Sequence, residues 1–418
     1  MWSMLLLLLA CQTAPEDSAV VWSSEACSEN VDIPTGFLED LDIAADPHSV
    51  VLGAAPAPRW IRYQWPSVET GTSAAFLWGT DLDTLASVVE IGPVEGFPEG
   101  AVRYEGASFL YGSGEVGAGL YRLHEVRLCG RLIPGTTYRY RVGGEGAWSE
   151  TFTITTPADE LDSFRIGIAG DSRGAYETWG QVVEAFDTAE VDFILFSGDM
   201  VEFGTSQEEW EAWLEAAGDV LARRPIVPAH GNHEFLSQNY FAQFALPGNE
   251  EWYSIDYGGM RIVVLNDTVR DAAELTQEQA VFLDQALTEA GDDWKIAVHH
   301  QSAYATCTTH NSDLDVRAAW VPAFDKHDVH AVFAGHNHLY ERSVPIRDGA
   351  AVGEGEGTVY VVTGGAGAPL YGSTEEQWFG AVAVPTNHYL IADVTPQEMT
   401  VNAYDLAGNV IDTFVVPR

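Results

Sequence analysis

Five short clusters of polar residues beyond residue 160 carry the side chains that could do chemistry. The clusters are Gly170-Asp171-Ser172-Arg173-Gly174, Gly198-Asp199, Gly231-Asn232-His233-Glu234, His299-His300 and Gly335-His336-Asn337-His338. Carboxylates and imidazoles are common ligands of Zn, Mn and Fe. The neighbouring glycines permit tight turns and let the backbone approach a ligand closely. These residue types predict a binding site for metal ions.

The positions of the clusters strengthen this prediction, because each follows a predicted strand. Strands predicted from apolar runs include residues 164–169, 191–196, 261–265, 294–298, 329–333 and 359–362. In open α/β sheets, sites form outside the carboxyl ends of strands, so five strand ends can meet in one place. A single histidine, by contrast, is usually packed or exposed. We interpret four other histidines in that way: His48, His124, His327 and His330.

Helices are predicted between these strands. Residues 181–186 are part of one helix. Thr276 with Gln279 forms a capping box for another helix, which ends near Ala290. Strands that alternate with helices predict a layered α/β (α+β) domain over residues 160–418.

The chain in front of this domain has a β pattern over residues 55–157. Residues 74–78 form a short apolar run, and residues 120–128 alternate, with one side chain in two on one face. A turn at Pro134-Gly135 leads into an alternating aromatic strand at residues 137–142. Short strands separated by turns predict an all-β sandwich. The turn and its Tyr-x-Tyr strand resemble a fibronectin type III domain.

The first 54 residues are expected to form a leader and a tether. An apolar run ends at Cys11, which indicates an export signal over residues 1–11, and Leu8-Leu9-Ala10-Cys11 resembles a bacterial lipobox with a lipidated cysteine. The run is too short for a membrane span, which needs about 20 residues. Residues 12–54 are acidic and weakly periodic, as in a tether with an irregular lead-in. We expect an exported protein, either a cell-envelope lipoprotein of the outer membrane or periplasm or a secreted form.

Three cysteines remain if Cys11 is lipidated: Cys27, Cys129 and Cys307. An odd number allows at most one intramolecular disulfide bond. Their spacing matches no metal-binding motif, and we interpret them as small buried or partly exposed thiols.

The charge of the chain excludes two kinds of partner. The 418 residues include 62 acidic and 20 basic side chains, for a net charge of −42. Binding to nucleic acid requires Lys and Arg to neutralise phosphates, so we expect none. Attraction to an anionic membrane surface is excluded on the same grounds, which leaves a lipid at Cys11 as the one expected membrane contact. The hydrophobic fraction of 46% is enough to build a core.

Taken together, the clusters make the sequence similar to the calcineurin-like metallophosphoesterases, and within them to the purple acid phosphatases. The resemblance covers about residues 55–410, and its best local stretches are residues 332–343 and 294–304. It implies a four-layer domain of two mixed sheets flanked by helices. It also implies a centre of two divalent or trivalent metal ions (Fe, Zn or Mn) between strand ends.

The same resemblance implies the metal ligands. Asp199 would bridge both ions, Asp171 and His338 would hold the first ion, and Asn232 and His336 would hold the second. A histidine from the strand after Trp294 completes the second set.

That histidine is ambiguous. Counting back from Tyr304 favours His300, which we prefer, whereas counting the apolar strand forward favours His299. The resemblance further implies that His233 and His310 contact the phosphate and protonate the leaving group.

Two departures from the purple acid phosphatases stand out. The first motif is one residue longer and carries Arg173, which we expect either to contact a substrate phosphate or to form a surface salt bridge. The tyrosine expected three residues after Asp199 is replaced by Glu202, and either this carboxylate or water would fill its place. In the family this tyrosine, bound to ferric iron, gives the colour. We therefore expect a colourless protein unless a distant tyrosine, such as Tyr176 or Tyr240, takes over.

These features predict an exported, acid phosphatase-like hydrolase of small-molecule phosphate esters. A metal-bound hydroxide would be the nucleophile, and His233 or His310 the general acid. A phosphodiesterase or nucleotide hydrolase of the same fold is an alternative, because the substrate wall consists of loops that the sequence does not place. A third reading, from another class, is a surface binding protein with an inert metallophosphoesterase fold.

Overall fold

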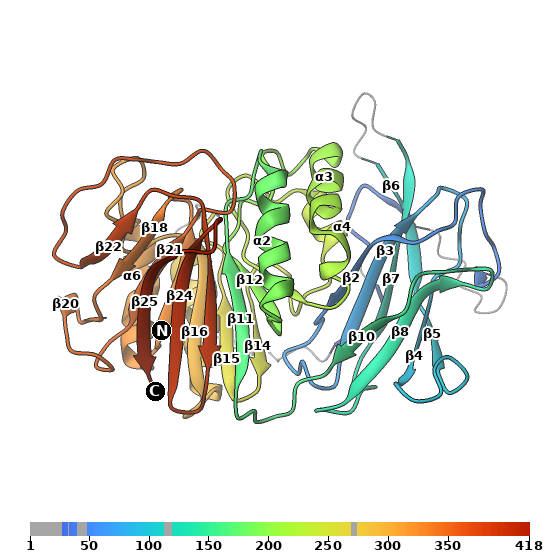
Figure 1. Ribbon diagram of the computed structural model, residues 1–418, viewed down its shortest axis with the longest axis horizontal. Coiled ribbons are helices and arrows are strands. Elements are labelled where there is room, and N and C mark those ends of the chain that lie inside the picture. The colour runs from blue at the N-terminus through green and yellow to red at the C-terminus, as the bar shows by residue number, and fades with distance from the viewer. Residues whose placement is uncertain (1–26, 32, 40–47, 113–118, 269–273) are drawn as a thin grey trace, which may run out of the picture.

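Two domains lie side by side along the long axis of the molecule (Figure 1). The computed structural model describes residues 27–31, 33–39, 48–112, 119–268 and 274–418. The predicted export signal and lipobox at Cys11, and most of the predicted tether, fall outside these residues. Among the described residues, no helix has the length and apolar character needed to cross a membrane.

The N-terminal domain is the predicted all-β sandwich. One sheet has the order β1 (Leu38–Glu39), β6 (Ala107–Tyr111), β7 (Tyr121–Leu128), β3 (Ala74–Thr80) and β2 (Arg59–Gln64). The other has the order β10 (Phe152–Thr155), β8 (Thr137–Gly144), β4 (Val88–Pro93) and β5 (Val102–Glu105), and β9 (Ala147–Trp148) pairs with β8. Strand β7 is buried on both faces, because Tyr121 and Leu123 pack against Ala242 of the second domain.

The second domain contains two mixed sheets. The six-stranded sheet has the order β13 (Ile226–Pro228), β12 (Phe193–Phe196), β11 (Phe164–Ala169), β23 (His388–Val394), β24 (Glu398–Asp405) and β25 (Val410–Pro417). The seven-stranded sheet has the order β14 (Tyr253–Tyr257), β15 (Met260–Val264), β16 (Trp294–Gln301), β17 (Ala331–Gly335), β21 (Val359–Thr363), β18 (Tyr340–Ser343) and β22 (Gly380–Val384). A short hairpin, β19 (Ile346–Arg347) and β20 (Ala350–Ala351), completes the strands. Strands β11 to β13 and strands β15, β16, β17 and β21 run parallel, whereas the others pair antiparallel.

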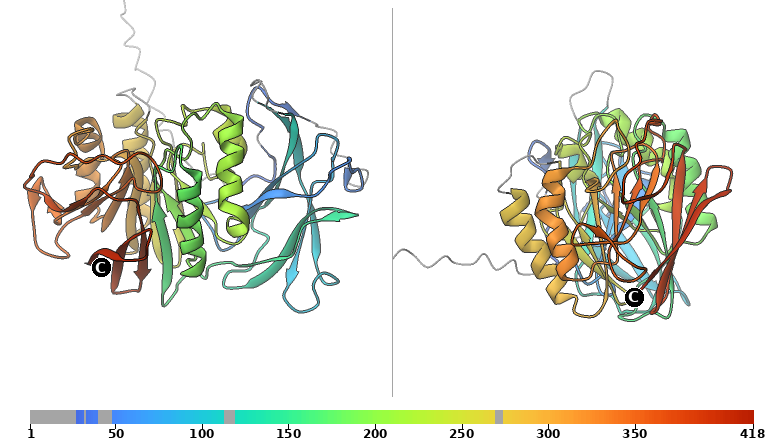
Figure 2. Two further views of the ribbon diagram at one scale, coloured as in Figure 1. Left: turned by 45° about the horizontal axis from the view of Figure 1, so that its top comes forward. Right: turned by 90° about the vertical axis from the view of Figure 1, so that its left-hand side faces the viewer.

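Helices cover the outer face of each sheet, so the domain has the predicted four layers. Helices α2 (Tyr176–Thr188), α3 (Gln207–Ala217) and α4 (Gln238–Gln243), with the short 3₁₀ helix η1 (Gly218–Val220), lie on one side. Helices α5 (Ala280–Glu289) and α6 (Leu314–Lys326) lie on the other (Figure 2, right). The apolar side chains of β16 alternate accordingly. Ile296 and Val298 join the core between the sheets, and Ala297 joins the core under α5 and α6.

The predicted capping box at the start of α5 is wrong. The segment before α5 is a π-helical turn, η2 (Glu274–Gln279), and α5 itself has no side-chain cap. The side chain of Gln279 instead accepts a hydrogen bond from the backbone N–H of Asn266 and donates one to its carbonyl. The side chain of Gln279 therefore bonds the backbone of buried Asn266 instead of capping the helix.

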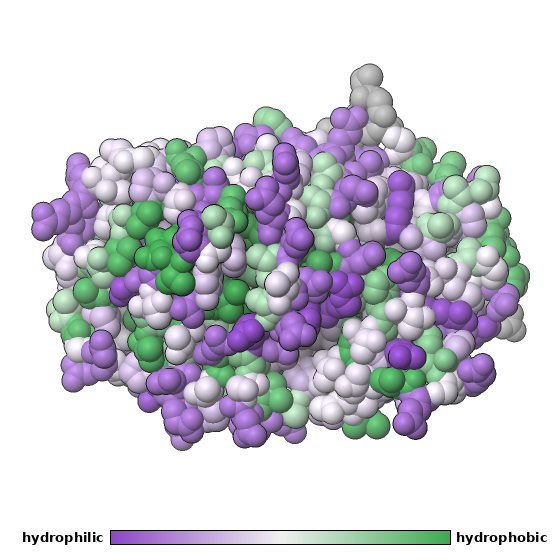
Figure 3. Space-filling view, viewed as in Figure 1, coloured by the Kyte–Doolittle hydropathy of each residue, from purple (hydrophilic) through white to green (hydrophobic). Residues whose placement is uncertain are grey.

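The two domains share a buried, hydrogen-bonded interface. The Tyr63 N–H donates to the Leu221 carbonyl at 2.8 Å, and the Tyr140 hydroxyl donates to the Ala222 carbonyl at 2.6 Å. On the face shown in Figure 3, hydrophilic residues are spread over both domains with smaller apolar areas between them.

Cys27 and Cys129 form the single disulfide bond that an odd number of cysteines allowed, and Cys307 is a buried free thiol. The interpretation as a thiol is therefore wrong for Cys27 and Cys129. The bond ties the first described residues to the loop after β7. Spacing in the sequence could not reveal this pairing, since the two cysteines are 102 positions apart and meet only in the folded sandwich.

Loss of this disulfide should destabilise the protein. Closing a loop of this length restricts the unfolded chain, so replacing both Cys27 and Cys129 by alanine should lower the free energy of unfolding by about 3–5 kcal/mol. Urea unfolding with and without reductant measures the effect. Cys307→Ala is the matched control, and its stability should still fall on reduction. Wild-type stability that is unaffected by reductant would contradict the pairing.

Candidate metal centre

Five predicted clusters meet where the carboxyl ends of the two sheets face each other. Asp171 follows β11, Asp199 follows β12, and Asn232 lies in the loop after β13. From the seven-stranded sheet come His300, near the end of β16, and the loop after β17 with His336 and His338.

Two groups of side chains in this place can each hold a metal ion. One consists of Asp171, Asp199 and His338, and the other of Asp199, His300 and His336. Within each group the ligand atoms lie within 4.8 Å of one another. Asp199 belongs to both groups, so its carboxylate stands between two positions for an ion.

Hydrogen bonds orient the imidazoles toward these positions. Nδ1 of His300 lies 2.7 Å from the Ser197 carbonyl, and Nδ1 of His338 lies 2.8 Å from the Pro369 carbonyl. A carbonyl can only accept, so each Nδ1 carries the proton and donates it. In the neutral ring, Nε2 is then left with a free lone pair, as a metal ligand requires. The donor set therefore fits divalent or trivalent first-row metals.

The same Nε2 atoms face the carboxylates. Nε2 of His300 lies 3.3 Å from Oδ1 of Asp199 and 3.1 Å from Oδ1 of Asn232. Nε2 of His338 lies 3.4 Å from Oδ1 of Asp171. Asn232 therefore joins the second group by geometry, with its amide oxygen as the ligand atom.

The backbone at these strand ends adopts uncommon conformations. Asp171, Asp199 and His336 have φ of 59°, 57° and 66°. Residues other than glycine rarely adopt this left-handed backbone conformation, and those that do are concentrated at functional sites. Two glycines permit the close approach: a Cβ on Gly231 would lie 2.2 Å from the Asp199 nitrogen, and one on Gly335 would lie 2.3 Å from Oδ2 of Asp171.

The buried charges interact strongly. Burial lowers the pKa of His300, but the Asp199 carboxylate more than offsets burial and raises this pKa to about 10. Burial raises the pKa of Asp199, but His300 and His233 hold it below the ordinary value of a carboxyl. Burial and the neighbouring imidazoles of His300 and His310 lower the pKa of His336 to about 2. Asp199 is thus kept as an anion, and His336 as a neutral ring that can donate a lone pair.

The two histidines predicted to act on substrate lie on different sides of the ligand groups. The backbone N–H of His233 donates to Oδ1 of Asp199 at 2.9 Å, and the ring Nδ1 of His233 lies 2.7 Å from the Glu202 carbonyl. Its Nε2 then points into the centre, 4.0 Å from Oδ2 of Asp199. The His310 ring lies 4.0 Å from the His336 ring, beside the second group.

Arg173 and Glu202 pair with each other. The guanidinium donates to the Glu202 carboxylate, and its Nε lies 3.5 Å from Oδ2 of Asp199. Glu202 belongs to neither ligand group of the described residues. Tyr371, which the sequence did not single out, stacks on His338 with ring centroids 4.1 Å apart.

His299 lies away from the ligand groups. Its Nδ1 is 2.8 Å from Oδ2 of Asp267, and its ring contacts Trp320 of α6. Asp267 also accepts the Gln301 N–H at 2.6 Å. His299 therefore faces α6 and His300 faces the space between the sheets. A β-bulge between Val298 and Gln301 shifts the register of β16 against β17 at this point.

Glu234 is part of the site, although the sequence analysis named it only as a member of a cluster and gave it no role. Its buried carboxylate accepts hydrogen bonds from the backbone N–H groups of Asp199, Met200 and Gly231, at 3.0, 2.7 and 2.7 Å. Burial and the nearby charge of Asp199 raise its pKa to about 8. It fixes the loop after β12 to the loop after β13. Its position directly after the Asn-His pair was the only sequence signal.

The other histidines have the packed positions expected of them. His124 is buried on Trp78 between Thr80 and Ser87, and His330 packs on Trp294. The other two histidines of the four that the sequence assigned to packing or the surface, His48 and His327, also lie outside both ligand groups.

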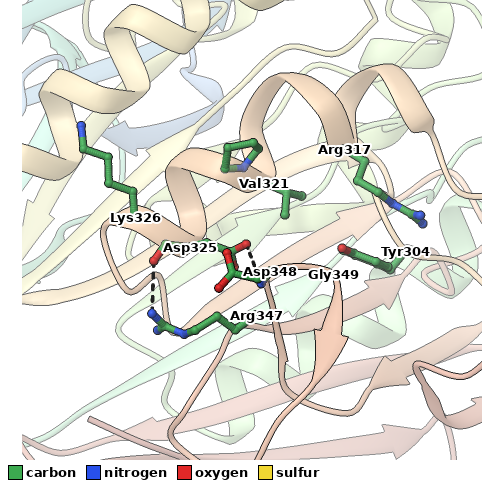
Figure 4. A pocket seen from close by; sticks show the side chains of 9 residues that line it. Tyr304, Arg317, Val321, Asp325, Lys326, Arg347, Asp348 and Gly349 are labelled. Atoms are coloured by element: carbon green, nitrogen blue, oxygen red, sulfur yellow. Dashed lines mark hydrogen bonds between the residues drawn. The ribbon is translucent and has the colours of Figure 1, made fainter.

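Two hollows lie near this region. One, of about 410 Å³, is lined by His310 and His336 together with polar residues such as Asp313 and Asp315. The other, of about 500 Å³, lies beside α6, with Tyr304 and Arg317 at one end (Figure 4). It contains no member of either ligand group, whereas the lining of the first hollow includes His336 of the second group.

Comparison with protein families matches both domains. Residues 164–340 match the calcineurin-like phosphoesterase family, and residues 58–156 match the purple acid phosphatase N-terminal domain. The first match includes the five residues of the ligand groups and Asn232.

Curated relatives have similar names. An uncharacterized protein of Mycobacterium tuberculosis is 27% identical over 298 residues, which is 56% of this chain and 56% of the relative. Purple acid phosphatase 21 of Arabidopsis thaliana is 27% identical over 308 residues, or 69% of this chain and 67% of the relative. Probable inactive purple acid phosphatase 27 of the same plant is 26% identical over 59% of this chain and 50% of the relative. The chain thus spans little more than half of several relatives.

Solved structures show the same fold. Purple acid phosphatase PPD1 from yellow lupin seeds superposes with a TM-score of 0.73 at 21% identity, covering 87% of this chain and 75% of that one. PhoD superposes with a TM-score of 0.63 at 12% identity, covering 86% and 93%.

Proposed function

Because the chain combines a calcineurin-like phosphoesterase domain with a purple acid phosphatase N-terminal domain, we propose that it is a metal-dependent hydrolase of phosphate esters. One observation carries the proposal: two ligand groups share the single carboxylate of Asp199. Two ions held in this way would activate a water molecule, orient the phosphoryl group and offset its charge. The ligands would be Asp171, Asp199 and His338 for one ion, and Asp199, Asn232, His300 and His336 for the other.

The protein's own groups would move the proton and hold the phosphate. With Nδ1 donating to the Glu202 carbonyl, Nε2 of His233 faces the centre, and the ring lies beside the carboxylates of Asp199 and Glu202. In the doubly protonated imidazolium, this Nε2 carries the proton that can pass to the oxygen of the departing alcohol. His310, at the hollow beside His336, is the second candidate acid. Arg173 can donate to a phosphate oxygen if it releases Glu202, and we propose this exchange as its role on substrate binding.

Two other functions make different predictions. A phosphodiesterase or nucleotide hydrolase would prefer esters with two organic groups, and the hollow of about 410 Å³ beside His310 leaves room for a second one. A surface binding protein with an inert site would turn over no ester. Some relatives are named as probable inactive phosphatases, which favours this binding role. The presence of both ligand groups opposes it.

The test combines metal analysis with a substrate panel. Protein as purified should contain close to two ions of Fe, Zn or Mn per chain, and it should hydrolyse aryl phosphate monoesters or diesters. A chelator should abolish turnover, and added metal should restore it. Protein that carries the two ions and hydrolyses no ester would contradict the proposed activity and favour the binding role.

Iron-loaded protein should lack the purple colour of its relatives. Glu202 stands where the colour-giving tyrosine is expected, and the next residue, Phe203, has no oxygen to donate. Tyr176 bonds Glu209 and Tyr240 is buried in the core, so neither reaches the ligand groups. The measurement is a visible absorption spectrum of iron-loaded, air-oxidised protein. A strong green-to-yellow band that Tyr371→Phe abolishes would overturn this prediction.

We also propose that the protein is exported as a lipoprotein anchored at Cys11. The support is the apolar run that ends at this cysteine. The full-length protein should appear in the membrane fraction, and Cys11→Ala should release it or leave it unprocessed. Soluble wild-type protein with a free thiol at Cys11 would contradict the anchor.

A further inference from the structure

Three large apolar side chains are exposed beside the candidate metal centre. They are Phe203, Phe235 and Leu236, which are 52%, 56% and 37% exposed. The two phenylalanine rings stack, with centroids 6.4 Å apart and planes 13° from parallel. Below, these three residues are called the apolar rim.

The apolar rim is joined to the proposed general acid. The Phe235 ring lies 6.0 Å from the His233 ring. Phe203 follows Glu202, whose carbonyl holds Nδ1 of His233, and the next N–H, from Gly204, donates to the His233 carbonyl at 2.7 Å. These hydrogen bonds therefore fix the position of the apolar rim relative to the histidine that faces the departing alcohol.

The backbone of the rim is held in a conformation that its residues disfavour. Phe235 and Leu236 have φ of 55° and 49°, where glycine would be the favoured residue. Neighbouring bonds impose this shape: the Ser237 N–H donates to the Glu234 carbonyl at 3.0 Å, and the Ser237 hydroxyl donates to the Gly204 carbonyl at 2.5 Å. Bulky apolar residues that are both strained and exposed cost stability in the free protein, which points to a role in binding.

We propose that the apolar rim binds the organic group of the substrate, so that the preferred esters carry one phosphate on an aromatic or similarly apolar alcohol. This inference rests on the proposed function and names its substrate class. The opposite side of the centre, the hollow with Asp313 and Asp315, is polar and acidic and does not suit such a group. The net charge of −42 likewise disfavours polyanionic substrates.

The experiment compares two non-hydrolysable ligands on metal-loaded protein. Isothermal titration gives the affinity of benzylphosphonate relative to methylphosphonate for wild type, Phe203→Ala and Phe235→Ala. Each variant should lower this ratio by about fivefold, since an aromatic contact has roughly this strength. The ratio of kcat/KM for phenyl phosphate over glycerol phosphate should fall in parallel. Ile133→Ala, which removes an equally exposed apolar side chain in the N-terminal domain, should leave both ratios as in wild type.

The outcomes separate this inference from the proposed function. Because alanine is also disfavoured at φ of 55°, Phe235→Gly serves as a second variant that fits the turn without the ring. A benzyl-to-methyl ratio that stays the same in all three rim variants overturns the inference, whether or not esters are hydrolysed. If wild type hydrolyses no ester but the affinity ratio falls as expected, the rim stands as a binding surface and the proposed activity fails.

Discussion

Asp199→Ala should abolish ester hydrolysis, lowering kcat/KM by about 10³-fold or more, and should cost more than one metal ion per chain. The Asp199 carboxylate lies 3.3 Å from Nε2 of His300 and accepts a hydrogen bond from the backbone N–H of His233. It therefore belongs to both ligand groups and also positions the proposed acid. Without it, two cations would face each other with no shared anion. Metal analysis and a steady-state assay measure the two effects.

Two matched variants sharpen this test. Asp171→Ala removes a carboxylate from one ligand group only, so it should cost one ion where Asp199→Ala costs more. Asp313→Ala removes an acidic side chain from the lining of the hollow beside His310, and this variant should retain both ions. If Asp199→Ala protein kept two ions and turned over normally, the assignment of the centre would be wrong.

His300→Ala should weaken metal binding by about 10- to 100-fold or more, whereas its neighbour His299→Ala should retain both ions. His300 directs Nε2 at Asp199 and Asn232, and its Nδ1 bonds the Ser197 carbonyl. His299 bonds Asp267 and packs on α6 instead. The measurement is metal content after dialysis against a graded series of chelator concentrations.

The expected cost of His299→Ala is to stability. Its removal leaves the buried carboxylate of Asp267 with one hydrogen-bond donor fewer and opens a cavity beside Trp320. A lowered midpoint of thermal unfolding with metal content intact is therefore the predicted signature. The reverse pattern, with metal lost in His299→Ala and kept in His300→Ala, would show that the two histidines were assigned in the wrong order.

The strands and the positions of the polar clusters could be predicted from the sequence because both depend on local patterns, whereas the role of each ligand came from the resemblance to a family. Apolar runs of strand length gave the parallel strands, and glycine with Asp, Asn or His after each run gave the clusters. Parallel strands bring their carboxyl ends to one edge, so Asp171, Asp199 and the loop with His336 and His338 were expected to meet. The fibronectin type III likeness, the domain limits and the export segment stay predictions.

Other features depended on contacts that no local pattern contains. The Cys27–Cys129 bond joins residues 102 positions apart, and Gln279 left its expected cap for a partner in the core. The Phe203 and Phe235 rings come from two loops that meet only because Glu234 ties them together.

The His299-His300 pair shows the boundary between the two kinds of information most clearly. The sequence by itself determined that a histidine at this strand would face the centre, because residue type and strand end are local properties. Which of the two does so depends on where β16 stops and on what lies above and below it. A β-bulge between Val298 and Gln301 disturbs the register of β16 at this pair, and it is the contacts of the two rings that place them on opposite faces. One face is closed by Asp267 and Trp320 and the other opens between the sheets, and only the packing of distant elements set that difference.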